Sequence, residues 1–289
     1  KVKSYEAKRV RIKAILSLLG IILNSAVQAE DLKTGQLPRW ELGGGLAFFH
    51  LPDYPGADQD RSYALPFPYV IYRGERLKAD REGLRGMVFE HPLWDLDISA
   101  GGSLPVNSAD NSAREGMDDL DFSFELGPSL RLKLHDSAME KIQLRLNLRA
   151  LLAVDGFPAM NYEGWMFNPE LRWGRRLSDA FSMRASVQMR YGSADYHDYF
   201  YGVGPRYATA IRPVYRGSSG YNSSGAGLNL RWHAKSNWRV MLGLSYLDLH
   251  GASFDDSPLF RKNSGVYFGF SVSRILWRSS VKVDSNTQD

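Results

Sequence analysis

The sequence predicts an all-β fold: a transmembrane antiparallel up-and-down β-barrel of about twelve strands, with ten as the alternative count. Three observations predict it. Apolar and polar residues alternate, the stretches in which they alternate are long, and the connections between these stretches are long and short in turn. A tilted strand needs roughly 9–11 residues to cross a bilayer, whereas strands of globular proteins usually have about 5–6. The length of the stretches therefore favours a membrane barrel over a soluble sandwich.

The clearest alternation lies between Lys141 and Val154. A strand places every second residue on the same face, whereas a helix would scatter these residues around its axis. One face is apolar and the other carries charge and amide groups. The apolar face has Ile142, Leu144, Leu146, Leu148, Ala150, Leu152 and Val154, and the other face has Gln143, Arg145, Asn147 and Arg149.

Twelve segments have this character. Those at 75–80 and 82–90 are the shortest, and if they formed one bent strand the count would be odd. The connections alternate between long and short, which predicts long extracellular loops and short periplasmic turns. The expected strands are 39–49, 63–73, 75–80, 82–90, 93–104, 119–134, 141–154, 164–177, 181–192, 220–234, 237–248 and 263–277.

Aromatic residues lie close to the ends of these strands. Tryptophan and tyrosine gather where the bilayer meets water, so we expect two interfacial girdles. The residues are Trp40, Tyr72, Trp94, Trp165, Trp173, Trp232, Trp238 and Trp277.

The two ends of the chain differ from the predicted barrel, residues 30–277. Residues 1–29 have six basic residues, a short apolar stretch and small residues before a cut after Ala29, which is typical of a secretory signal peptide. Without them the chain has 30 basic and 31 acidic residues, so the basic isoelectric point gives no reason to expect a nucleic-acid partner. Residues 278–289 are a polar tail, which we interpret as a disordered periplasmic extension.

Composition excludes some chemistry. There is no cysteine, which excludes a lipoprotein anchor at cysteine, disulfides, thiol catalysis and thiolate metal sites. No spacing of histidine and carboxylate residues matches a known ligand set, so we expect no metal and no cofactor.

Charged residues are expected on the inner face. Arginines of 141–154, 164–177 and 181–192 would face carboxylates of 93–104 and 119–134. The charges either pair and fill the lumen or line a water-filled channel, and a narrow or filled lumen is the expectation for this strand number. The candidates are Asp95, Asp97, Asp121, Glu125, Arg145, Arg149, Glu170, Arg172, Arg184, Arg190 and Arg231.

One loop offers a hydrolase hypothesis. Asp195 and His197 fall in the long loop 193–219, and Asp118 and Asp119 lie at the mouth of another strand. An Asp/His pair that faces an Asp pair can activate a water molecule. The alternative interpretation is an ordinary polar surface loop, and we expect no catalytic residues.

Several motifs resemble the MipA/OmpV family of outer-membrane proteins. They are Tyr54-Pro55-Gly56-Ala57-Asp58, the stretch Leu65-Pro66-Phe67-Pro68-Tyr69-Val70-Ile71-Tyr72-Arg73-Gly74, Tyr199-Phe200-Tyr201-Gly202-Val203 and Asp256-Ser257-Pro258-Leu259. They are in the family order and cover most of the chain. Trp277 and the tail depart from the family's usual Tyr-Arg-Phe ending.

The resemblance implies a protein of the Gram-negative outer membrane, surrounded by lipid and lipopolysaccharide. It also implies a non-enzymatic scaffold that connects a lytic transglycosylase to a peptidoglycan synthase, through periplasmic segments such as 135–140 and 278–289. A narrow porin-like diffusion channel and a surface hydrolase that uses Asp195 and His197 are the alternatives.

Overall fold

The computed structural model describes residues 36–80, 83–155, 159–234 and 237–284. The predicted signal peptide and its cut after Ala29 lie outside them. The described strands are β1 (Gln36–Pro38), β2 (Trp40–Pro52), β3 (Asp60–Arg73), β4 (Leu77–Asp80), β5 (Gly83–Glu90), β6 (Trp94–Ser103), β7 (Ser123–Asp136), β8 (Glu140–Val154), β9 (Met160–Arg176), β10 (Phe181–Gly192), β11 (Gly220–His233), β12 (Trp238–Asp248), β13 (Ser264–Arg278) and β14 (Lys282–Asp284).

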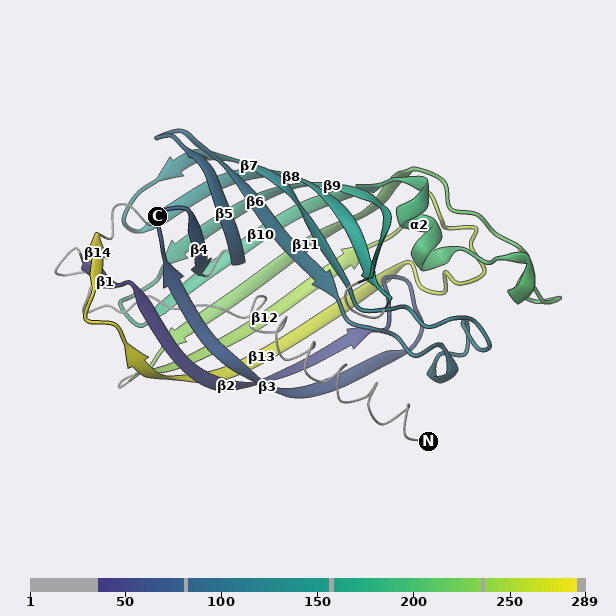
Figure 1. Cartoon of the computed structure of the whole chain (residues 1–289), viewed down its shortest axis with the longest axis horizontal. Helices are drawn as coiled ribbons and strands as arrows, with labels where there is room; N and C mark the ends of the chain where they lie inside the picture. The colour runs from purple at the N-terminus through teal and green to yellow at the C-terminus, as the bar shows by residue number, and fades with distance from the viewer. Residues whose placement is uncertain (1–35, 81–82, 156–158, 235–236, 285–289) are drawn as a thin grey trace.

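Strands β2 to β13 form one closed antiparallel barrel, in which each strand pairs with the next and β13 pairs with β2 (Figure 1). The prediction of twelve strands is confirmed, including the two short ones, β4 and β5, which form a hairpin. Among the described residues no helix is both long and apolar enough to cross a membrane.

The two ends of the barrel differ, as the loop lengths predict. At the long-loop end the connections β2–β3, β6–β7, β10–β11 and β12–β13 gather with helix α2 (Ala194–Tyr201), on the right in Figure 1. At the short-turn end the strands are joined by tight turns such as residues 137–139. Residues of each strand alternate between an apolar outer face and an inner face, which is polar in strands such as β8. On β3 the inner residues Phe67, Tyr69 and Ile71 instead form an apolar cluster with Ala47 and Ile275.

Large apolar side chains are exposed all around the outer wall. A closed barrel satisfies the backbone hydrogen bonds of its strands, so such a wall can lie in hydrocarbon. The exposed residues include Leu46, Phe48, Leu126, Leu148, Leu171, Val187, Leu228, Leu230, Leu242, Leu244, Val266 and Phe270.

The aromatic residues are distributed differently from the prediction. Of the eight that we assigned to two girdles, only Trp165 lies near the long-loop end, because β9 begins there. The other seven lie near the short-turn end, where Trp40 packs on Tyr72 with ring centroids 4.2 Å apart. Exposed tyrosines accompany Trp165 at the long-loop end, namely Tyr162, Tyr191 and Tyr246.

The ladder between β3 and β6 is interrupted. The β4–β5 hairpin pairs with only the last residues of β3, and no described residue pairs β3 directly with β6. Arg73 N donates to Arg39 O at 2.9 Å, so odd residues of β3 bond to β2 and even residues face the interruption. Pro66 and Pro68 are both even, and having no N–H they leave no unpaired donor at this edge.

The loop between β6 and β7 crosses above this interruption and binds the β2–β3 loop. Arg61 contacts Asp110 at 3.4 Å, and Asn111 Nδ2 donates to Asp53 Oδ2 at 2.7 Å. The rim of the barrel is therefore continuous although the ladder beneath it is not.

One predicted strand boundary was wrong, and part of the predicted tail is ordered. The strand expected at 119–134 begins only at Ser123, so Asp121 belongs to the preceding loop, which Val106 and Leu120 close through an isolated bridge. In the predicted tail, Lys282–Asp284 form β14 and pair with β1. The tail was expected to be disordered, but a partner strand at the opposite end of the chain supplies its backbone hydrogen bonds.

Candidate functional site

Two features of the barrel carry polar groups that the fold alone does not require: the charged inner face and the loops at the long-loop end. Asp95 and Asp97 on β6 are both buried beside Arg131 on β7. Arg131 Nη2 lies 2.9 Å from Asp97 Oδ2, and Nη1 lies 3.6 Å from Asp95 Oδ2. Lys133 contacts the other Asp95 oxygen at 2.9 Å.

The remaining candidates also lie on the inner side of their strands. Arg149 Nη1 is 3.6 Å from Glu125, and its Nε donates to Ser99 Oγ at 3.0 Å. Glu170 Oε2 is 2.7 Å from Arg172. The structure brings these charges together with neighbours on the same wall. The exception is Asp121, which is outside the strands and accepts a hydrogen bond from Tyr199 through its backbone oxygen at 3.2 Å.

Several charged residues of the inner face were not among the candidates predicted from the sequence. Glu41 and Arg73 form a buried pair at 2.5 Å between β2 and β3, and Lys78 on the hairpin contacts Glu90 at the same distance. Arg85 and Arg239 are also buried. Except for Glu90, which follows a register shift between Met87 and Phe89 of β5, they keep the alternation of their strands, and that signal identifies them once the strand phase is known.

Cations outnumber carboxylates on the inner face of the described strands. The cations include Arg73, Lys78, Arg85, Arg131, Lys133, Lys141, Arg145, Arg149, Arg172, Arg184, Arg190, Arg231 and Arg239, and the carboxylates include Glu41, Glu90, Asp95, Asp97, Glu125, Asp136 and Glu170. An interior of this composition attracts anions and repels cations.

A hydrophobic cluster, which we call the cap, lies at the long-loop end. It joins four loops and the ends of three strands, and its members are Tyr54, Ala57, Val106, Ala113, Leu120, Leu151, Met166, Tyr196, Phe200, Tyr201, Val203, Leu247, Leu249, Ala252, Phe254 and Leu259. At its centre Tyr201 stacks on Phe254, with ring centroids 3.7 Å apart. The cap is therefore a packed core of its own, formed by buried side chains from loops that are far apart in the sequence.

Polar side chains hold the cap loops to each other. Tyr54 OH donates to Leu259 O, and Tyr201 OH donates to Pro55 O, both at 2.8 Å. Arg114 Nη1 donates to Phe200 O at 3.1 Å. Burial raises the pKa of Tyr54 to about 12, so these hydroxyls remain donors at neutral pH.

Helix α2 places the cap against the barrel wall. Its N-cap Ser193 accepts from Tyr196 N at 3.2 Å and from Trp165 N at 3.0 Å. Gly164 on β9 has a φ of +99°, and a Cβ there would lie 2.4 Å from Tyr196 N. Only glycine therefore allows the helix to approach the strand so closely.

The same helix separates the residues of the hydrolase hypothesis. Asp195 is exposed, whereas His197 on the other side has no exposed surface. His197 Nδ1 donates to Ser218 O at 2.6 Å, and Nε2 accepts from Asn222 Nδ2 at 3.2 Å. Burial lowers the pKa of His197. A neutral imidazole with both nitrogens bonded to protein has no nitrogen left to activate water.

The aspartate pair of that hypothesis is occupied elsewhere. Asp119 Oδ1 accepts from Ser108 N at 2.8 Å, and Asp118 pairs with Arg206 at the surface. In the described parts of the chain, no three His, Cys, Asp or Glu side chains form a group that could hold a metal ion. The geometry does not assemble the hydrolase site.

These features define the class of the protein. A closed barrel of twelve antiparallel strands, apolar outside and charged inside, with long loops at one end, is an outer-membrane β-barrel of a Gram-negative bacterium. The long-loop end is then extracellular and the short-turn end periplasmic.

The family follows from a comparison of sequences. The family model described as MltA-interacting protein MipA matches residues 44–276, and the chain belongs to this family. The resemblance that the motifs indicate is confirmed. A search of curated proteins finds no match.

Solved structures of outer-membrane barrels are similar to the chain at low sequence identity. The translocator domain of autotransporter NalP from Neisseria meningitidis is 11% identical, with 94% of this chain and 96% of that chain covered and a TM-score of 0.43. An outer membrane channel from Pseudomonas putida F1 is 14% identical, covering 83% and 97%, with a TM-score of 0.40. The NanC porin is 10% identical, covering 82% and 99%, with a TM-score of 0.38. The family model, not these distant likenesses, identifies the chain.

Proposed function

We propose that this protein is a non-enzymatic scaffold that holds peptidoglycan-remodelling enzymes, a lytic transglycosylase and a peptidoglycan synthase, at the inner surface of the outer membrane. The packed cap is the observation that carries the proposal, because we expect loops that pack together over the end of a barrel to favour anchoring over free diffusion. The name of its family, MltA-interacting protein, supports the same role.

The periplasmic end offers a defined surface for such partners. Strands β1 and β14 form a two-stranded ribbon, in which Leu37 lies opposite Val283 (Figure 1). Arg39 N donates to Val281 O at 2.8 Å, which joins the ribbon to the barrel. Leu37 is buried, whereas Val281 is 55% exposed. An ordered strand pair with exposed side chains costs less entropy on binding than a free tail.

The proposal includes the processing of the chain. Removal of residues 1–29 after Ala29 would leave a short segment before β1, and β1 pairs with β14 of the tail at the periplasmic end. Both ends of the mature chain would then contribute to one docking surface.

Site-specific photocrosslinking in cells tests the scaffold. A photoreactive amino acid at Val281 should crosslink a lytic transglycosylase. The matched control is Ile211, which is 87% exposed in a loop at the opposite end of the barrel and should give no such product. Absence of any peptidoglycan enzyme from the Val281 products, with the barrel correctly inserted, would refute the role.

A second candidate, a narrow diffusion channel, rests on the excess of inner-face cations. In this function the cap would be a gate, and the cations would select anions. Ion conductance across a planar bilayer distinguishes it from a permanently closed scaffold.

A further inference from the structure

The described wall of the barrel is interrupted between β3 and β6, in the half next to the long-loop end (Figure 1). At the hairpin, β4 and β5 separate these two strands by three strand spacings, which is about 14 Å. Toward the long-loop end, backbone groups on both flanks have no ladder partner on this side among the described residues. They belong to Ala64, Pro66 and Pro68 of β3 and to Ala100 and Gly102 of β6.

The edge of β3 is unsuited to pairing with another strand. Pro66 and Pro68 have no N–H, so this edge offers carbonyl oxygens but few donors. A bare sheet edge is costly in hydrocarbon, where no water satisfies its backbone groups. A molecule that fits this edge therefore combines an apolar body with hydrogen-bond donors.

Behind this edge the inner face of the barrel is apolar. Leu65 of β3, Phe49 of β2 and Leu104, which follows β6, all pack against the cluster that contains Phe67 and Ile71. The side chains of Leu65, Phe49 and Leu104 are only partly buried, and they come from both flanks of the interruption. An apolar surface therefore continues from one flank to the other on the inside.

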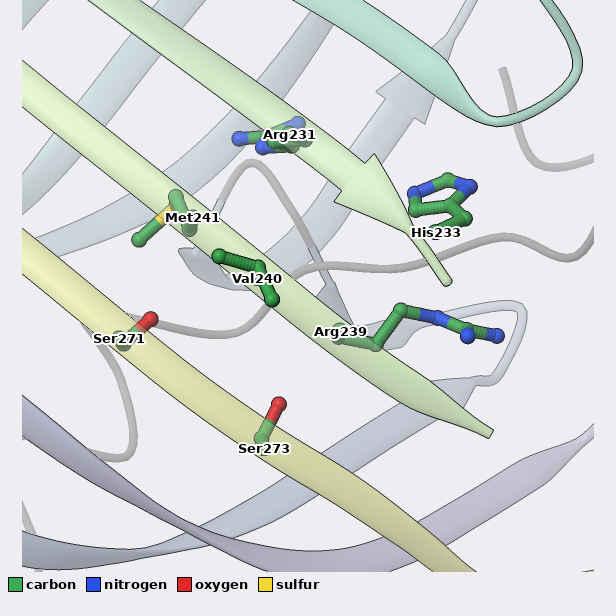
Figure 2. A pocket seen from close by; sticks show the side chains of 7 residues that line it. All are labelled: Arg231, His233, Arg239, Val240, Met241, Ser271 and Ser273. Carbon is green, nitrogen blue, oxygen red and sulfur yellow. The ribbon is translucent and has the colours of Figure 1, made fainter. Parts of the chain in front are cut away.

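Farther round the wall, the inner face carries polar side chains. Figure 2 shows Arg231, Arg239 and Ser273 there, on β11, β12 and β13. Met241 marks the border, because it lies beside these residues and also packs against the apolar cluster. A hydrocarbon chain inside the barrel would therefore be stabilised behind the interruption and not against the charged wall.

The outside of the interruption is continuous with the lipid-facing wall. Leu46 and Phe48 on β2 and Ile98 on β6 are exposed on the outer face of its flanks. Acyl chains of the bilayer therefore lie directly against the interruption. Because the interruption is in the half next to the long-loop end, these chains belong to the outer leaflet.

We propose that the interruption is a lateral binding site for an acyl chain of lipopolysaccharide, which enters from the outer leaflet between β3 and β6 and lies against Phe49, Leu65 and Leu104. The chain buries methylene groups against these side chains. Lipopolysaccharide fits better than a phospholipid, because its acyl groups carry hydroxyl and amide N–H groups that can donate to the carbonyl oxygens of β3. The site does not depend on the scaffold role.

Photocrosslinking in intact cells tests the site. A photoreactive amino acid at Leu65, on the inner face, should form a covalent adduct with lipopolysaccharide. The matched control is Ser186 on the inner face of β10, which is paired on both sides, with Arg172 and with Gly227, and should give no adduct. Leu244, which is 48% exposed on the outer face, should react with lipid in any inserted barrel and so verifies insertion.

Each other outcome contradicts the proposal. No lipid adduct at Leu65, with Leu244 reacting, would mean that no acyl chain enters the wall. An adduct with phospholipid alone would exclude lipopolysaccharide as the occupant. Equal yields at Leu65 and Ser186 would show lipid throughout the lumen and no site at the interruption.

Substitutions of Leu104 test whether the chain passes between the two flanks. Leu104→Asp should lower the adduct yield at Leu65 by about tenfold or more, because a carboxylate on the apolar surface is costly to bury beside hydrocarbon. Leu104→Met keeps the surface apolar and should retain the yield. An undiminished yield in Leu104→Asp would overturn the path. The heat-dependent electrophoretic mobility of folded barrels verifies that both variants have folded.

Discussion

At the scale of single residues, burial decides what the charged groups of this barrel do. His197 and Arg131 have the residue types of functional sites, but their surroundings make them structural. His197 is enclosed between α2, Ser218 and Asn222, and Arg131 neutralises two buried aspartates. In both cases, replacing the side chain would lower the stability, because its partners would remain buried without a group to bond to.

The cap should loosen in acid because of His197. Its pKa is lowered from 6.5 by burial, so as pH falls below that value the unfolded or opened loop takes up a proton before the closed loop does. Stability is therefore constant at higher pH and decreases below the unfolded pKa. Hydrogen exchange of residues 193–219 should quicken between pH 7.5 and about 5 relative to the barrel strands. In His197→Gln, that pH dependence should disappear; its persistence would assign the effect to another group.

Replacement of Arg131 should destabilise the barrel strongly. Arg131→Met leaves Asp95 and Asp97 buried with less compensation, which typically costs about 3–5 kcal/mol of unfolding free energy. The control is Lys141→Met: Lys141 lies 3.4 Å from Asp136 in a pair that is partly exposed, worth about 0–1 kcal/mol. Urea unfolding of both variants in lipid vesicles measures the difference. Equal effects would mean that burial does not determine the value of these pairs.

At the scale of elements, β3 is the least conventional strand. Among the described residues, only Tyr72 and Arg73 of β3 are paired with the short β4–β5 hairpin, and the prolines stand at even positions, whose N–H would face the interruption. Prolines protect sheet edges in this way, because proline has no N–H that would stay unpaired or bond to another strand. The stretch that gave the family resemblance is thus also the structural edge of the barrel.

A proline scan of β3 tests this assignment. Ala64 is even, so Ala64→Pro should change the unfolding free energy by less than about 1 kcal/mol. Leu65 is odd and lies opposite Ala47, so Leu65→Pro breaks a bond to β2 and should cost about 1–3 kcal/mol more than Leu65→Ala. Urea unfolding in vesicles compares the three variants. A greater loss of unfolding free energy from Ala64→Pro than from Leu65→Pro would mean that the even residues of β3, and not the odd ones, bond to β2.

At the scale of the whole molecule, the barrel has the packed cap at its long-loop end and an excess of cationic side chains on its inner face. The cap packs at the long-loop end, whereas the pair of strands β1 and β14 lies at the short-turn end. The two ends therefore differ in structure.

Removal of the stacked pair at the centre of the cap should open the barrel. The wild-type protein should insert into planar bilayers without conductance steps. The double variant Tyr201→Ala, Phe254→Ala loses the rings that pack 3.7 Å apart and should show anion-selective steps. Adding Arg145→Glu should reduce that selectivity. Steps in the wild type would favour the channel over the scaffold, and silence in the double variant would mean that the lumen is closed below the cap.

Much of the fold could be predicted from the sequence, because strand period and turn composition are local properties. The alternation of apolar and polar residues predicts the inner residues of β8 and its limits to within one residue. The hairpin of β4 and β5 is expected because a barrel with both termini in the periplasm needs an even number of strands. The family resemblance likewise depends on short motifs.

The site could be predicted only in part, since neighbours across strands depend on the register. That Arg131 meets Asp97, or that Arg239 lies between His233 and Ser273, requires the pairing of distant segments. The boundary at Ser123 was missed because Asp121 continues the alternation although its backbone has already left the sheet.

The sequence by itself predicted the membrane barrel, a count of twelve strands with ten as the alternative, and the faces of its clearest strands, because the bilayer imposes the same period-two pattern on every crossing. The tertiary structure alone decided that four loops pack into a cap, that α2 turns Asp195 and His197 to opposite sides, and that the tail pairs with β1. Those outcomes depend on contacts between residues far apart in the chain, which no local pattern encodes.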